Sequence, residues 1–274
     1  MRYIESLYKG DFGFRRIAMN RTTKLILAGL LASTFASIAA AADLTPVEQP
    51  MVAQPVDSGT GFYVGSLSSA TFMDDTDFDV AGGLFNVNTD YDVGYYSALR
   101  AGYNFGSMGF VAPRIELEVG YGNASVDNHS VNGFGVDSID SYGDARTIQG
   151  FVNGYLDIPL AAPGETGFLS GITPYVGGGV GAINMKLKKQ GIAGFATLMD
   201  DSDTRFAYHL DAGLGINLQA IGLFTNTALF NGTTMDIGYR YTAADDFSFT
   251  AREGTTSKTD FSSNAITIGF RKQF

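Results

Sequence analysis

Short segments with alternating polarity recur from residue 61 to the end of the chain, and they constrain the fold more than any other sequence feature. The clearest is 205–218, where one face carries Phe206, Tyr208, Leu210, Ala212, Leu214, Ile216 and Leu218. The other face carries polar, charged or small residues, which are Arg205, Ala207, His209, Asp211, Gly213, Gly215 and Asn217. A period of two is that of a β-strand and does not fit a helix. The chain is therefore expected to be all-β.

Seven further segments repeat this design. They are 61–70, 95–105, 114–121, 148–158, 174–185, 234–241 and 265–274, of which 174–185 is so rich in glycine that its facing is ambiguous. A length of about ten residues suits a tilted strand that crosses an outer membrane. Single-chain bacterial barrels have an even number of strands. The pattern thus predicts an eight-stranded antiparallel transmembrane β-barrel over 61–274.

The last segment carries an apolar face and a polar face of unusual contrast. Ile266, Ile268, Phe270 and Phe274 point one way, whereas the other face holds Thr267, Gly269, Arg271 and Gln273. The last strand of an outer-membrane barrel pairs with the first and shows apolar side chains to lipid. We expect the four apolar residues to face lipid and to serve as the assembly signal read by the barrel-assembly machinery. Lys272, also on this face, is expected to snorkel to the interface.

One long apolar run, 25–42, follows a short basic region and ends in a series of alanines. This order is typical of a secretory signal peptide. We expect a signal peptide over 1–41, with an N-terminal extension over 1–18, and cleavage after Ala41 or Ala42. An uncleaved membrane anchor is the alternative, because the run is just long enough to span a bilayer.

The segment 42–60 contains Pro46, Pro50 and Pro55 and shows no periodicity. It predicts an extended periplasmic lead-in, with an interaction motif as the alternative. From Asp43 onward the chain has 12 Lys and Arg against 26 Asp and Glu, a net charge of −14. Nucleic-acid binding is disfavoured because phosphate contacts need a basic surface. The chain has no cysteine, which excludes disulfides.

The connections between the predicted strands alternate in length. Those at 106–112, 159–173 and 219–231 are short or moderate, whereas those at 71–94, 122–145, 187–203 and 242–262 are long and acidic or polar. Barrels of this class have short periplasmic turns and long extracellular loops. The four long connections are therefore expected outside the cell.

The inward faces of the predicted strands carry balanced charge. Arg100, Arg114, Arg205, Arg240 and Arg271 oppose Glu116, Glu118, Asp157, Asp211 and Asp236, and His209 lies beside Asp211 on the same face. An eight-stranded barrel has room inside for little more than its own side chains. We expect these groups to form interlocking salt bridges as structural lumen charges, rather than to line a wide diffusion pore.

Three motifs carry a family resemblance. They are 174–181 (PYVGGGVG), 236–241 (DIGYRY) and the ending of 269–274, with Gly269, Phe270, Arg271 and Phe274. Over residues 60–274 the chain resembles the opacity-type outer-membrane β-barrel family, which is related in fold to the transmembrane domain of outer-membrane protein A. The resemblance implies an eight-stranded barrel with exposed loops that serves as a surface antigen, adhesin or weak porin.

Two histidines invite an enzymatic interpretation. His209 and Asp211 resemble the His-Asp pair of omptin-type surface proteases, and His129, in the segment 127–130, resembles the histidine of lipid A deacylase barrels. Structural roles are favoured for both, with His129 expected in a loop. Sites are argued from geometry, and no catalytic residue or cofactor is assigned.

The acidic first loop partly matches a calcium-binding pattern. Asp75, Asp77 and Asp79 have the initial spacing of an EF-hand, but Val80 and Asn86 occupy positions that need Gly and Glu. A solvated acidic loop is favoured, with divalent bridging to lipopolysaccharide phosphates as the alternative, and no metal ligand is assigned.

The sequence as a whole predicts a non-enzymatic outer-membrane barrel that supports envelope integrity and surface interaction. Expected partners are outer-membrane lipid and lipopolysaccharide, the assembly machinery, and a host or surface ligand at the extracellular loops. The alternatives are a small-solute porin, a barrel enzyme acting on lipid A or peptides, and a soluble lipocalin-like or sandwich protein.

Overall fold

The computed structural model describes residues 59–80, 85–131, 134–136, 141–161, 168–192, 196–221, 230–250, 254 and 256–274. The predicted signal peptide and nearly all of the predicted lead-in lie outside these residues. No helix in the described ranges is long and apolar enough to cross a membrane.

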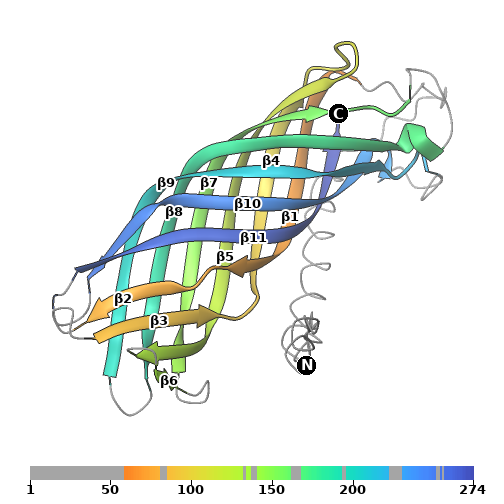
Figure 1. Cartoon of the computed structure of the whole chain (residues 1–274). Coiled ribbons are helices and arrows are strands. Elements are labelled where there is room, and N and C mark those ends of the chain that lie inside the picture. Colours follow the sequence, from red (N-terminus) through yellow and green to blue (C-terminus); the bar gives the residue numbers. More distant parts are fainter. Residues whose placement is uncertain are drawn as a thin grey trace, which may run out of the picture.

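Eight long strands close into an antiparallel barrel (Figure 1). They are β1 (Gly61–Met73), β4 (Gly94–Asn104), β5 (Ala112–Val131), β7 (Ser141–Asp157), β8 (Ile172–Ile192), β9 (Ala196–Asn217), β10 (Thr233–Thr250) and β11 (Thr256–Gln273). Each pairs with its neighbours in sequence, and β1 pairs with β11 to close the ring. The predicted eight-stranded barrel is confirmed. No sheet edge is left between these strands, which suits a structure surrounded by lipid.

The C-terminal strand closes the barrel as expected from its sequence. β11 pairs with β1 from Tyr63 opposite Gln273 to Met73 opposite Ser263. Its outward face is more varied than predicted, because Ile266 and Phe274 are 60% and 68% exposed but Phe270 is only 5% exposed. The end of the barrel at which β1 begins and β11 ends is called the terminal end below, and the opposite end the far end.

The strands continue well into the predicted long connections at the far end. β5 reaches Val131, so that His129, expected in a loop, pairs with Thr89 instead. The first connection contains β2 (Thr76–Val80) and β3 (Phe85–Tyr91), and the second contains β6 (Phe134–Val136). Ladder pairing satisfies backbone polar groups that a loop would leave to water. A short 3-10 helix, η1 (Phe168–Gly171), precedes β8 at the terminal end.

The two faces of the barrel wall exchange polarity along the strands. On β8, Val176 and Val180 point outward and are exposed, whereas further along the same outer face carries Lys186. Over the same stretch the inner face becomes apolar, with Ile183 and Met185 fully buried. The period of two is kept from Val176 to Lys186 on this strand, so only the chemistry of each face changes. The outer face of the wall is apolar toward the terminal end, and the inner face is apolar at the far end.

The inward apolar residues of the far end form one packed cluster. This apolar cluster comprises Ala145, Phe151, Ile183, Met185, Leu187, Ala207, Phe247, Phe249 and Phe261. Phe247 stacks on Phe249 with ring centroids 5.8 Å apart and meets Phe261 edge-on at 6.1 Å. Aromatic rings in these arrangements add to the free energy gained from burial. The far end of the lumen is therefore filled by hydrocarbon.

Carboxylates of β9 replace the missing ladder bonds to β10 near the far end. Backbone pairing of these strands ends at Ala244 opposite Ala207. Beyond it, Asp203 accepts a hydrogen bond from the backbone N–H of Ser248, and Asp201 accepts one from Thr250, both at 2.8 Å. Burial alone would raise the pKa of Asp203, but the N–H groups of Ser248 and Thr204 and the Arg205 guanidinium outweigh it and lower that pKa. The ionised carboxylate is the form that holds the strands together.

Acidification is expected to open this junction. Because the folded-state pKa of Asp203 lies below its unfolded value of about 3.9, its contribution to stability is present above that value and is lost as the pH falls through the folded-state pKa. Hydrogen exchange at the Ser248 amide, corrected for the intrinsic pH dependence, should accelerate below about pH 4. Asp203→Asn should exchange rapidly already at neutral pH. Equal protection of Ser248 in the wild type and in Asp203→Asn at neutral pH would contradict the assignment.

Candidate functional site

The lumen between the apolar cluster and the terminal end is filled by charged side chains. Ten of the eleven predicted lumen residues are buried there: Arg100, Arg114, Glu116, Glu118, Asp157, His209, Asp211, Asp236, Arg240 and Arg271. Arg205 is the exception. It lies on the inward face but nearer the far end, where its side chain is 37% exposed and pairs with Asp203 at 2.7 Å.

Six of these residues form a closed ring in which cations and anions alternate. Arg271 contacts Asp157 at 3.2 Å and Asp236 at 3.1 Å. Asp157 also binds Arg114 at 2.9 Å, and Asp236 binds Arg100 at 3.2 Å. Glu116 completes the ring, with Arg114 at 3.7 Å and Arg100 at 3.8 Å. This charged ring therefore holds three arginines and three carboxylates, with no excess charge of either sign.

The remaining four residues form a second group, the charged arm. Arg240 donates to Asp211 Oδ1 from Nε at 2.7 Å and to both oxygens of Glu118 at 2.6 and 3.0 Å. This paired geometry is the strongest that a guanidinium makes with a carboxylate. Tyr96 donates a further hydrogen bond to Glu118 at 2.8 Å. Arg240 thus ties β10 to β9 and to β5 across the lumen.

Asn153 joins the charged ring to the charged arm and contacts the His209 ring. Its amide nitrogen donates to Glu116 at 3.1 Å and to Glu118 at 3.3 Å, which leaves Oδ1 facing His209 Nε2 at 2.9 Å. His209 Nδ1 lies 2.7 Å from Asp211 Oδ2, at an angle too bent for a well-formed hydrogen bond. Both ring nitrogens therefore face acceptors.

Several buried lumen residues were not assigned to the lumen from the sequence, and Tyr63 and Tyr96 fit the interfacial aromatic girdle by type alone. Besides Tyr96 and Asn153, Tyr63 donates to Glu116 at 2.9 Å and Tyr155 donates to Asp211 at 3.2 Å. All four lie on inward faces, so strand alternation was the available signal. Their type gave no hint of it, since tyrosine is equally common at the outer rims of barrels.

Glycines on neighbouring strands make room for these bulky groups. A Cβ on Gly120 would collide with the Tyr96 ring, and one on Gly179 would collide with Asn153 and His209. Close approach of inward side chains therefore explains the inward glycines of β8, which are Gly177, Gly179 and Gly181.

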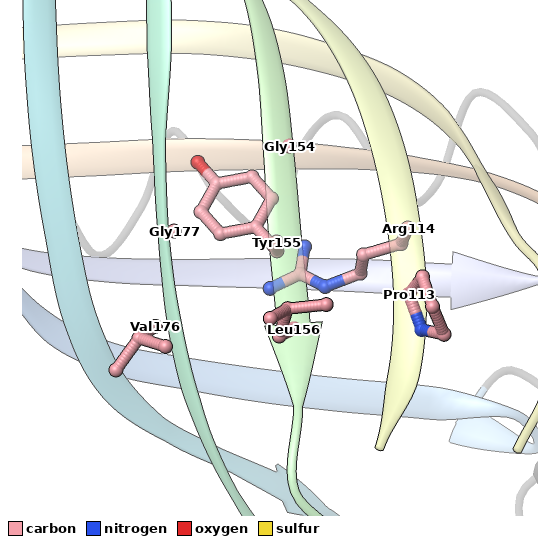
Figure 2. A pocket seen from close by; sticks show the side chains of 7 residues that line it. All are labelled: Pro113, Arg114, Gly154, Tyr155, Leu156, Val176 and Gly177. Atoms are coloured by element: carbon pink, nitrogen blue, oxygen red, sulfur yellow. The ribbon is translucent and has the colours of Figure 1, made fainter. Parts of the chain in front are cut away.

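A shallow hollow lies beside the ring between β5, β7 and β8 (Figure 2). It is lined by Pro113, Arg114, Gly154, Tyr155, Leu156, Val176 and Gly177. The Arg114 guanidinium reaches from β5 over the Tyr155 ring, 4.0 Å from its centroid. Its charge is already compensated by Asp157, so the hollow offers a ligand no unpaired cation.

No group of three or more potential metal ligands occurs within the residues that the structure describes. Asp77 and Asp79, which match part of the EF-hand spacing, lie in β2, and their side chains are not among the described ones.

Comparison with known proteins identifies the architecture. The family model described as outer membrane protein beta-barrel domain matches residues 28–274. No curated protein matches. Similar solved structures include Neisserial surface protein A, at 15% identity over 79% of this chain and 99% of that chain, with a TM-score of 0.43. OprG from Pseudomonas aeruginosa has 14% identity over 80% and 97%, with a TM-score of 0.39. Ail of Yersinia pestis has 13% identity over 78% and 99%, with a TM-score of 0.35.

Proposed function

The chain belongs to the outer-membrane β-barrel family, and on that premise we propose that it is a closed, non-enzymatic barrel of the bacterial outer membrane that displays an acidic surface outside the cell. In such barrels the chain ends lie on the periplasmic side and the longer connections outside. The far end carries exposed Asp74, Asp75, Asp245, Asp246 and Asp260, which supports this orientation. Envelope support and surface interaction are the roles that such a scaffold can fill.

The main support for a closed barrel is that two groups of side chains fill successive parts of the lumen. The charged ring and charged arm fill the part nearer the terminal end, and the apolar cluster fills the far end. Each of the four buried arginines contacts at least one carboxylate. A hydrated solute would have to separate these pairs and also pass through a hydrocarbon layer, and both steps are costly.

A planar bilayer distinguishes this proposal from a small-solute porin. The purified, folded barrel is expected to insert without producing stepwise conductance, whereas a general porin added to the same membrane should do so. Inserted protein recovered from proteoliposomes should keep the heat-modifiable gel mobility of a folded barrel. Reproducible conductance steps from the folded wild type would contradict a closed lumen.

The geometry also argues against catalysis at the predicted His-Asp pair. His209 and Asp211 are 1% and 8% exposed; Asn153 faces His209 Nε2, and the Asp211 carboxylate accepts hydrogen bonds from Tyr155 and Arg240. A substrate would need to displace these partners. We propose that the pair is structural, that the C-terminal strand is read during assembly, and that any host or surface ligand binds the acidic far end.

A further inference from the structure

Four outward side chains lie next to one another where the outer wall changes from apolar to polar. The register places Asn123 of β5 opposite Arg146 of β7, Arg146 opposite Lys186 of β8, and Lys186 opposite Ser202 of β9. These residues are called the polar row. Their side chains share the outer face because each lies an odd number of positions from the inward, buried residues of its strand.

The polar row borders the lipid-facing band on its far-end side. Tyr121 and Ile148, two positions nearer the terminal end on β5 and β7, are exposed on the outer face, as is Phe206 of β9. Tyr95 lies beside Tyr121 with ring centroids 6.2 Å apart, as in an interfacial aromatic girdle. Two positions along a strand span about 7 Å. The polar row therefore reaches the headgroup region of the outer leaflet.

Two cations lie opposite each other in this row, and among the described residues only Arg146 has a carboxylate partner. Like charges directly opposite across a strand pair are destabilising. Asp144 contacts Arg146 at 3.4 Å, but Arg146 Nε has no hydrogen-bond partner among the described residues. Lys186 forms no salt bridge within the part of the chain that the structure describes. The pair also stands out in a chain whose net charge is −10.

We propose that the polar row binds a phosphate group of an outer-leaflet lipid, such as the phosphates of lipopolysaccharide. A phosphate placed between Arg146 and Lys186 converts their repulsion into two attractions, with the planar guanidinium and the ammonium as donors. The side-chain amide N–H of Asn123 and the hydroxyl of Ser202, which lie opposite Arg146 and Lys186, can donate further hydrogen bonds. The inference rests on membrane placement and not on closure of the lumen, so bilayer conductance leaves it unaffected.

Binding is measured in phosphatidylcholine nanodiscs that contain the full-length folded barrel. Purified lipopolysaccharide, the same lipid with its lipid A phosphates removed, and inorganic phosphate are titrated separately, and the melting temperature is recorded. Phosphorylated lipopolysaccharide is expected to stabilise the wild type. The double variant Arg146→Gln/Lys186→Gln should weaken this binding by on the order of tenfold or more, as expected for removing two basic residues from a lipid surface. Lys258→Gln, an exposed cation on β11, is the matched control and should bind like the wild type.

A change of sign separates binding from a general effect on stability. Without anionic lipid, Lys186→Gln should melt at or above the wild-type temperature, because it removes the like-charge contact. With phosphorylated lipopolysaccharide it should melt below the wild type. Equal stabilisation of wild type and double variant, or equal stabilisation by the dephosphorylated lipid, would overturn the proposal. An equal effect of inorganic phosphate at matched concentration would overturn the assignment to lipid.

Discussion

Replacing Arg240 with glutamate is expected to destabilise the barrel by at least about 3–5 kcal/mol, the usual cost of removing one partner of a buried ion pair. Arg240 is buried and holds Glu118 and Asp211 through contacts of 2.6 and 2.7 Å. The substitution leaves both carboxylates without their guanidinium and adds a third beside them. The temperature at which the folded, fast-migrating gel band is lost should fall markedly.

Arg205→Glu provides a matched control for this reversal. Arg205 lies on the same inward face of the wall, but its side chain is partly exposed and pairs with Asp203 close to solvent. Exposed pairs contribute only about 0.2–1 kcal/mol. Arg240→Met should also destabilise the barrel, because it leaves Glu118 without its guanidinium. Adding Glu118→Gln to this variant should recover part of the lost stability, because it removes that uncompensated carboxylate. Equal melting temperatures for Arg240→Glu and Arg205→Glu would contradict the conclusion that the buried charge network stabilises the barrel.

Strand positions were predictable because the period of two is written directly into the sequence. β9 illustrates this, since its alternation from Phe206 to Ile216 matches outward, largely exposed positions in the barrel. A buried inner face and a lipid-facing outer face both reward strict alternation, so register errors are penalised on either side. Strand ends were predicted less well. β8 ends at Ile192 and β9 begins at Ala196, so both strands extend into the connection predicted at 187–203.

The lumen charges were predictable as a set but not as a network. Alternation assigns Arg240 and Glu118 to the inner face, yet nothing in their spacing shows that they meet across the barrel. That contact depends on shear and on which strands oppose each other, which are properties of the closed ring. Height along the barrel was equally hidden, so Arg205 was grouped with arginines that lie much deeper.

The apolar cluster was not predicted, because the two faces of the wall exchange polarity toward the far end. Phe247 and Phe249 lie in a stretch interpreted as a loop because its neighbours are acidic. Counting from Arg240, an inward residue, does not identify them, since the register shift between Ala244 and Phe247 alters the pairing on that strand. A bulge of this kind has no clear sequence signature.

Replacing Phe247 and Phe249 together with alanine is expected to have the second large effect. Both rings are fully buried and belong to one stacked group with Phe261. A buried Phe→Ala change costs about 3–5 kcal/mol, and the two losses share neighbours, so the total need not be their sum. The far ends of β9, β10 and β11 should open while the charged ring and charged arm stay formed. Limited proteolysis within 242–262 is the measurement, with a large increase in cleavage rate expected.

Phe72→Ala is the matched control, because that ring lies on β1 and is exposed. It should leave cleavage within 242–262 near the wild-type rate. The double variant also tests which filling closes the lumen. If Arg240 and its carboxylates close it without help, bilayers containing the variant should show no conductance steps even though the far end has opened. Conductance in the variant, with the gel mobility of a folded barrel retained, would show that hydrocarbon is the seal and that the buried charges serve stability alone.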